Sequence, residues 1–171
     1  AAAPRIPGFL SNLLARFAEN AFWMARYMER AENLARIIDV NETLARDDQG
    51  GQQWFPIVQL NADDEKFFKH YEEATSDAVL RFYILDDSNP SSIRSTVRMA
   101  RENARSLRHL ISTEMWMQLN VFHDFLKGLS EPDIALTKID HLCQSIKERC
   151  QTHTGITEGT FFRDETWHFY N

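Results

Sequence analysis

The residues best suited to chemistry lie in one short stretch, Ala25–Arg36, with the sequence ARYMERAENLAR. It holds three arginines, two glutamates and an asparagine but no lysine, within about three turns of a predicted helix. Arginine makes planar, bidentate contacts with carboxylates and phosphates that lysine cannot make. These groups could face solvent, hold the fold together or bind an anionic ligand. The candidates are Arg26, Arg30 and Asn33 for ligand binding, and Glu29 and Arg30 for catalysis.

A later segment repeats this chemistry with the run RENAR, which supplies three more ligand-binding candidates: Arg101, Asn103 and Arg105. Glu114 follows on the same predicted helix, where the 3-4 spacing of apolar residues calls for an apolar side chain. We therefore expect Glu114 to be buried, and a buried carboxylate must be paired, hydrogen-bonded or protonated. Arg26 and Arg30 are its natural partners, so the two helices are predicted to share a polar layer inside the bundle.

Two interpretations compete for this layer. The favoured one is an ion-pair network that fixes the register of the helices, because no nucleophile lies beside a base. The other is a site for a phosphate or a carboxylate, and an enzyme built on it would use Glu29, Arg30, Glu114 and Arg101. The arginines would bind an acyl phosphate or a carboxylate, and Glu114, with its pKa raised by burial, would act as acid or base.

Neither a metal nor a cofactor is predicted. Cys150 and His153 are three residues apart and His141 is nearby, but a closed zinc site needs four ligands at compatible spacing. The chain has no GxGxxG, no Walker loop and no GxSxG motif, which are the signatures of common nucleotide and hydrolase sites. The run 154–160 could offer backbone N–H groups to a phosphate, although a tight interhelical loop is the favoured use.

The composition narrows the partners and the compartment. Hydrophobic residues make up 43% and charged residues 26% of the 171, which is ordinary for a globular domain. The net charge of −6 argues against nucleic acid as a partner, and the lack of an apolar run of about 18 residues argues against a membrane span. Cys143 and Cys150 are about 10 Å apart along a predicted helix, too far for a disulfide. We therefore expect a reducing, cytoplasmic compartment.

Apolar spacing predicts an all-α bundle of five or six helices, with two long helices at about 11–47 and 91–127 as its spine. The low content of glycine and proline, 6 and 5 residues, favours such long helices over many short strands. Residues 1–10 are predicted to be a flexible lead and 49–61 a connector. The remaining 11–171 form the helical domain, which is expected to end partway through a larger protein.

Local signals place the shorter elements. Helices are predicted over 62–74 and 76–85, and Asn89 and Pro90 are expected to be the N-cap and first residue of the second long helix. The run Ser130–Asp133 resembles a capping box that opens a helix to about residue 153. A loop at 155–160 and the start of a last helix from 162 complete the predicted order.

Four blocks of this sequence, in order, are similar to the bacterial Alpha-E family, an all-helical domain with a Glu-Arg motif. They are LLARFAENAFWMARYMERAENLARIIDV, LRFYILDDSNPSSI, ARENARSLRHLISTEMWMQLN and GITEGTFFRDETWHF. The resemblance covers roughly residues 13–171 and places the motif at Glu29-Arg30. Ala25 stands where the family commonly has glycine, and the run 160–162 departs modestly from the usual pattern. The resemblance further implies a second Glu-Arg helix beyond this chain.

The resemblance implies a pathway rather than a reaction. Members of the family are typically encoded with, or fused to, an ATP-grasp ligase and a transglutaminase-like protein, which implies peptide synthesis or modification. The favoured hypothesis is an accessory domain that binds such protein partners. The alternatives are an enzyme acting on an activated carboxylate or peptide through the Glu/Arg site, and a purely structural module that forms homo-oligomers.

Overall fold

The computed structural model describes residues 3–5, 7–47 and 53–169, with side chains as far as Thr157. Every regular element within these residues is helical, which confirms the all-α fold. Seven α-helices are joined by one π-helical turn, η1, and one 3₁₀ turn, η2. Their bounds are α1 Gly8–Asp47, α2 Phe55–Leu60, α3 Asp64–Phe68, α4 Ser76–Leu80, η1 Arg81–Leu85, α5 Ile93–Ser106, α6 Thr113–Lys127, η2 Glu131–Ile134 and α7 Ile139–Phe169.

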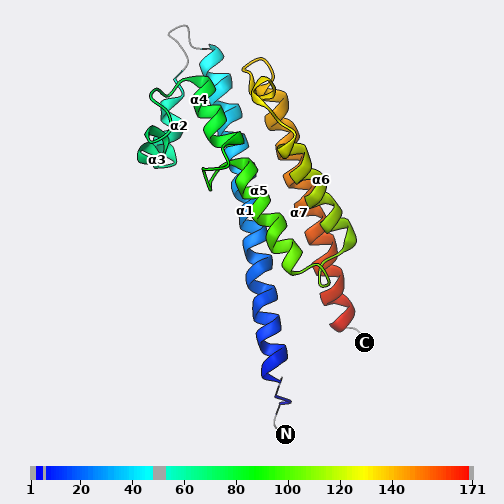
Figure 1. Ribbon diagram of the computed structural model, residues 1–171. Coiled ribbons are helices and arrows are strands. Elements are labelled where there is room, and N and C mark those ends of the chain that lie inside the picture. Colours follow the sequence, from blue (N-terminus) through cyan, green and yellow to red (C-terminus); the bar gives the residue numbers. More distant parts are fainter. Residues whose placement is uncertain (1–2, 6, 48–52, 170–171) are drawn as a thin grey trace.

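The long helices form an elongated bundle (Figure 1). α1 packs along both α5 and α7, and α6 packs against the same two helices. The short helices α2 and α3 lie beside the C-terminal part of α1 (Figure 1). α2 packs against α4, and Phe67 of α3 packs against Phe82 of η1. One continuous apolar core joins these elements, and its largest fully buried side chains include Trp54, Tyr83, Phe67, Phe82 and Phe122.

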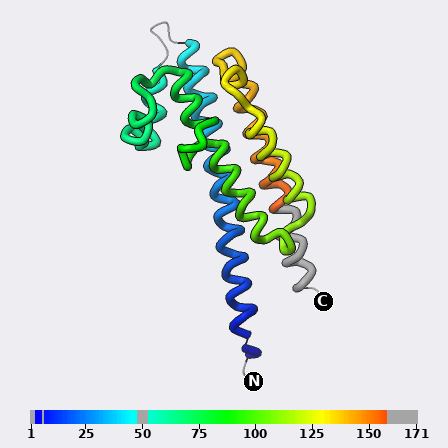
Figure 2. Tube along the Cα trace, viewed as in Figure 1, coloured from blue at the N-terminus to red at the C-terminus, as the bar shows by residue number. Residues whose placement is uncertain are grey.

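α1 carries the predicted apolar stripe, but the stripe is buried only from Met24 onward. Met24 and Met28 are each 2% exposed and Ile38 is 0% exposed, whereas Leu14, on the same stripe, is 57% exposed. The reason is the length of α1, whose N-terminal half extends past the end of α5 (Figure 2). Apolar side chains of this projecting half therefore lie open to solvent: Phe9, Leu10, Leu13, Leu14, Phe22 and Trp23.

The predicted long helix 91–127 is in fact two helices, α5 and α6, and the second long helix of the fold is α7. The residues between them contain no glycine or proline, so the apolar spacing continues through the break. Leu107 and Ile111 are buried in the corner, and the Ser112 hydroxyl caps α6 by accepting a hydrogen bond from the Met115 N–H (3.1 Å). The chain can then fold back so that α6 packs against α5.

The predicted cap of α5 is also displaced. The Ser92 hydroxyl, not Asn89, caps α5 by accepting from the Ser95 N–H (3.1 Å). The Asn89 amide instead donates to the Phe82 carbonyl (2.9 Å), and its oxygen accepts from the Ser91 N–H (3.0 Å). Asn89 thus stabilises the turn that joins η1 to α5.

The other boundaries show what local signals can and cannot do. The helix predicted over 76–85 is confirmed as α4 and η1, and the capping box at Ser130–Asp133 is confirmed, although it opens only the short η2. The helix predicted over 62–74 is limited to α3, and part of the predicted connector forms α2. α1 already begins at Gly8, inside the predicted lead, while residues 48–52 lie outside the described residues. The predicted loop at 155–160 is wrong, because α7 runs through it.

Candidate functional site

The predicted polar layer between the helices is not formed. On α1, Arg26 pairs with Glu29 at 2.9 Å, and the side chains are 45% and 56% exposed. Glu32 pairs with Arg36 at 3.0 Å, the side chains being 21% and 55% exposed, and it also accepts a hydrogen bond from the Gln151 Nε2 of α7 (3.3 Å). Most of the charged face of α1 is therefore solvated, and exposed pairs of this kind contribute only about 0–1 kcal/mol each.

The prediction that Glu114 is buried is wrong. Glu114 is exposed in the first turn of α6, where a carboxylate interacts favourably with the helix dipole. The buried face of α6 carries Met115, Leu119, Phe122 and Leu126 instead. The break between α5 and α6 resets the helical phase, so the seam extrapolated along α5 does not apply to α6.

The second charged set stabilises the contact between α5 and α6. The Arg101 Nε donates to the Asn120 Oδ1 (2.7 Å), and its guanidinium lies 5.8 Å from the centre of the Trp116 ring. The Glu102 Oε1 lies 3.6 Å from the Arg101 Nη1, and its Oε2 lies 3.7 Å from the Arg105 Nη1. Asn103 is half-buried on the same helix. The contacts of Arg101 with Asn120 and Trp116 join α5 to α6, whereas the Glu102 pairs lie within α5. None of these contacts involves Glu29 or Arg30.

Arg30 and Asn33 are also exposed, but they line a cavity of about 280 Å³. The cavity is formed where α1 meets the turn after α2, η1 and the start of α5. α1 supplies Arg30 and Asn33, and the turn after α2 supplies Asn61 and Asp63. η1 supplies Tyr83, the segment before α5 supplies Ser91, and the first turn of α5 supplies Thr96. Neither Glu29, Glu114 nor Arg101 lines it, so the four residues predicted for an enzyme are not brought together here.

The inner wall of the cavity is polar and deeply buried. Asp63 is 7%, Tyr83 1% and Thr96 2% exposed. The Tyr83 hydroxyl donates a hydrogen bond to the Asp63 Oδ2 (2.9 Å). Burial, together with the hydrogen bond and the charge of Asp63, raises the pKa of Tyr83 well above its usual range. Tyr83 therefore stays a hydrogen-bond donor and orients the carboxylate of Asp63.

The backbone before Asp63 has an unusual conformation. α2 ends in a Schellman motif, in which the Ala62 N–H donates to the Gln59 carbonyl and the Asp63 N–H to the Val58 carbonyl, both at 3.0 Å. Ala62 has φ = 54°, a left-handed conformation that glycine adopts far more readily. This turn fixes the position of Asp63, which precedes α3 but makes no side-chain capping hydrogen bond to it.

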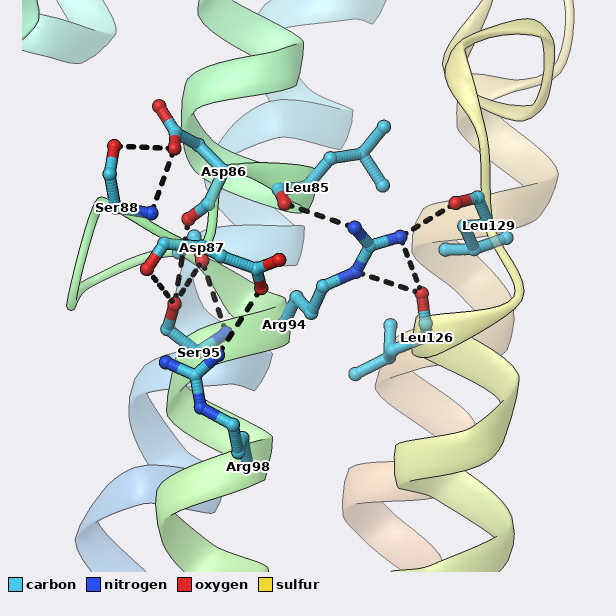
Figure 3. A network of polar contacts seen from close by, with 10 residues as sticks. Leu85, Asp86, Asp87, Ser88, Arg94, Ser95, Arg98, Leu126 and Leu129 are labelled. Carbon is cyan, nitrogen blue, oxygen red and sulfur yellow. Dashed lines mark hydrogen bonds and ion pairs between the residues drawn. The ribbon is translucent and has the colours of Figure 1, made fainter.

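Tyr83 is held by equally specific contacts. It lies in the π-helical turn η1, and such turns are frequent at functional sites. Arg94 fastens the end of this turn to α6 and to the residues after α6 (Figure 3). Its Nη1 donates to the Leu85 carbonyl (3.1 Å), its Nε and Nη2 to the Leu126 carbonyl (3.1 and 2.9 Å), and its Nη2 also to the Leu129 carbonyl (2.6 Å).

Three groups at the cavity have unused hydrogen-bonding capacity. The guanidinium of Arg30 makes no hydrogen bond or ion pair among the described residues, and its Cζ lies 5.9 Å from the centre of the Tyr27 ring. The Asp63 Oδ1 and the Thr96 hydroxyl have no hydrogen bond to any side chain or backbone group in the same set, and neither is a buried atom sealed from solvent. No ion pair joins Arg30 to Asp63 within that set, so the cavity holds a cation and an anion that do not neutralise each other directly.

The sequence pattern indicates Arg30 and Asn33 on α1, but it does not indicate the opposite wall of the cavity, which Asp63 and Tyr83 form. Asp63 and Asp64 lie at the start of the helix predicted over 62–74, and no local sequence signal shows that the Asp63 side chain turns away from α3. One signal was present: a tyrosine inside the apolar run 82–85 needs a partner for its hydroxyl when it is buried. That signal indicates a buried acceptor but cannot identify Asp63, which lies 20 residues earlier in the chain.

The cysteines and the buried histidine form no site of their own. Cys143 and Cys150 are free and buried, and burial raises the pKa of each thiol to about 12. The His153 Nδ1 lies 3.3 Å from the Gln118 Oε1, and burial lowers the pKa of His153 to about 4. Among the residues whose positions are given, no three His, Cys, Asp or Glu side chains gather closely enough to hold a metal ion.

Helix α7 also removes the predicted phosphate loop. Residues 154–160 lie inside α7, where backbone N–H groups are used within the helix. They are thus not available to an anion. In the described part of the chain, no helix is long and apolar enough to cross a lipid bilayer.

Comparison with known proteins identifies a family but no individual relative. The family model named Alpha-E, described as a predicted alpha-helical domain with a conserved ER motif, matches residues 13–171. No curated protein and no solved structure matches the chain significantly. The match covers nearly the whole chain, and the fold is all-helical as the description requires. The chain belongs to the Alpha-E family.

Proposed function

We propose that this Alpha-E domain is an accessory binding domain whose cavity receives a carboxylate or phosphate group at Arg30. The observation that carries the proposal is the guanidinium of Arg30, which lines the cavity and has no acidic partner among the described residues. Its neighbour Glu29 is paired with Arg26 instead. The two residues of the Glu-Arg pair therefore have different roles, and only the arginine serves the cavity.

The surroundings of Arg30 support the binding of an anion. A guanidinium offers parallel N–H groups that match the two oxygens of a carboxylate. Asn33 and Thr96 line the same cavity and can add neutral hydrogen bonds. Arg30 itself is exposed, whereas Thr96 on the inner wall is 2% exposed, so water screens a ligand's contacts less on that inner side than on an open surface.

A titration can test this proposal. We would titrate the protein with inorganic phosphate, acetyl phosphate and N-acetylated amino acids, and follow binding by calorimetry and by NMR of the protein amides. Replacing Arg30 with Gln should weaken the binding of at least one of these anions by about tenfold or more, the loss of one charge-assisted hydrogen bond. The matched control is Arg36→Gln, because Arg36 lies on the same helix and its pair with Glu32 is exposed. Equal binding by both variants would refute the proposal.

We further propose a protein partner, the ATP-grasp ligase or transglutaminase-like protein that the family resemblance implies, in a reducing cytoplasm. The projecting part of α1 supports such a contact, because its exposed Leu10, Leu13 and Leu14 continue the stripe that is buried further along the helix, and Phe22 and Trp23 add exposed apolar surface beside it. Contiguous exposed apolar surface commonly marks an interaction site. The accessory domain would then present a bound carboxylate or acyl phosphate to its partner.

A pull-down of the protein with its ligase, followed by an ATP-dependent ligation assay with and without the domain, tests this partnership. Leu14→Glu and Phe22→Glu should abolish the complex, since both side chains are 57% exposed and support no core packing. Asp77→Asn, on the exposed surface of α4, is the control. Absence of a complex together with an unchanged ligation rate would rule out this accessory role.

A further inference from the structure

We infer that the ligand of this cavity is a zwitterion, a free amino acid or a short peptide whose carboxylate binds Arg30 and whose ammonium group binds Asp63. The inference rests on the proposed function of Arg30 and adds a second, opposite recognition point. Both charged residues line one cavity, and the structure joins them by no ion pair among its described residues. A molecule with both charges can complement both walls at once.

Asp63 has the features of a ligand-binding carboxylate. It is 7% exposed, and a carboxylate this deeply buried is costly unless it is paired or hydrogen-bonded. Tyr83 satisfies only the Oδ2, while the Oδ1 has no partner in the described part of the chain and is not sealed from solvent, so water or a ligand can reach it. An ammonium group is the natural complement, because it supplies both a positive charge and N–H donors.

The backbone conformation before Asp63 directs its side chain toward the cavity rather than toward α3. An aspartate before a helix normally accepts hydrogen bonds from the first helical N–H groups, yet Asp63 makes no such contact with α3. The turn that directs it elsewhere requires a left-handed alanine at position 62. A left-handed residue is common at a helix end, but an alanine there is less favourable than a glycine, so the surrounding contacts must maintain this turn.

The size of the cavity agrees with a small ligand. A volume of about 280 Å³ corresponds to roughly nine water molecules at about 30 Å³ each. This space suits a single amino acid or the end of a short peptide. A simple anion would bind Arg30 but face the charge of Asp63, and a simple amine would face the charge of Arg30, so the two walls together favour a zwitterion.

The test compares free and N-acetylated ligands on the same protein. We would screen the twenty amino acids and glycylglycine by ligand-observed NMR, and measure the strongest binder and its N-acetyl form by calorimetry. Acetylation removes the ammonium charge and leaves the carboxylate, so affinity should fall by about tenfold or more. Asp63→Asn should cause a similar loss for the free amino acid and no loss for its acetylated form.

Matched variants keep the result interpretable. Asn has the shape of Asp and retains an oxygen that can accept from Tyr83, so Asp63→Asn is expected to fold, which circular dichroism and a urea midpoint will check. Asp64→Asn is the control, because Asp64 is the adjacent half-buried carboxylate and does not line the cavity.

The outcomes separate this inference from the proposal about Arg30. Equal binding of the free and acetylated forms, both lost in Arg30→Gln, would overturn the zwitterion and leave the anion site intact. Binding of the free amino acid that is insensitive to Asp63→Asn would overturn the role of Asp63. Absence of binding by either form, in a folded protein that also ignores phosphate and acetyl phosphate, would overturn both.

Discussion

Replacing Arg94 with Met should destabilise the protein by about 3–5 kcal/mol, although Arg94 touches no ligand. The guanidinium makes four hydrogen bonds to three backbone carbonyls, those of Leu85, Leu126 and Leu129 (Figure 3). The Leu126 carbonyl keeps a partner, the Leu129 N–H (3.2 Å). The carbonyls of Leu85 and Leu129 have no other hydrogen bond among the described residues, and an unsatisfied buried acceptor costs about 1–3 kcal/mol.

The measurement is urea denaturation followed by circular dichroism at 222 nm, with the free energy of unfolding extrapolated to water. Arg94→Lys should lose less than Arg94→Met, because an ammonium group keeps a charge and some donors but cannot reach three carbonyls in one plane. Arg98→Met is the matched control one turn further along α5. Its pair with Asp87, at 3.3 Å, is largely exposed and should contribute less than about 1 kcal/mol. If Arg94→Met and Arg98→Met differ by less than about 1 kcal/mol, the proposed anchoring role of Arg94 is wrong.

Two further predictions concern single residues. Ala62→Gly should stabilise the protein by about 0.5–1 kcal/mol in the same urea assay, since φ = 54° costs a residue with a side chain about 1–2 kcal/mol. The control Ala18→Gly, at an exposed position inside α1, should instead destabilise the protein by about 1 kcal/mol. Loss of stability in both variants would contradict the strain at Ala62. Burial lowers the pKa of His153 from 6.5 to about 4, so the folded state favours the neutral imidazole. The contribution of His153 to the free energy of unfolding is therefore complete above pH 6.5 and declines as the pH falls from 6.5 to about 4. Between pH 7 and pH 4 the wild type should therefore lose about 3 kcal/mol more than His153→Gln, and parallel stability profiles of the two proteins would refute this.

Much of the fold follows from local sequence patterns. The 3-4 spacing of α1, the capping box at Ser130–Asp133 and the helix over 76–85 are all local features, and all three are confirmed. The errors arise where packing overrides local preference. No breaker marks the corner at Leu107–Ser112, and Gly155 lies inside α7 rather than in a loop, because helix propensity is a weak constraint compared with the burial of an apolar face.

The candidate site was predicted only on the side that α1 provides. The arginine bias of Ala25–Arg36 indicates anion chemistry, and Arg30 and Asn33 do line the cavity. The extension of that layer to Glu114 and Arg101 failed, because it assumed one helical phase from residue 91 to residue 127. Once α6 begins with a new cap at Ser112, no periodicity carried over from α5 can place Glu114.

The sequence by itself determined that the chain is helical, which face of α1 is apolar and that arginines gather on that helix. These properties depend on side chains three or four residues apart, which any single helix brings together. Only the tertiary structure decided that the apolar stripe is buried from Met24 onward and that Arg30 shares a cavity with Asp63 and Tyr83. The physical reason is that such a cavity forms between segments distant in the chain, and their meeting depends on the packing of the whole core.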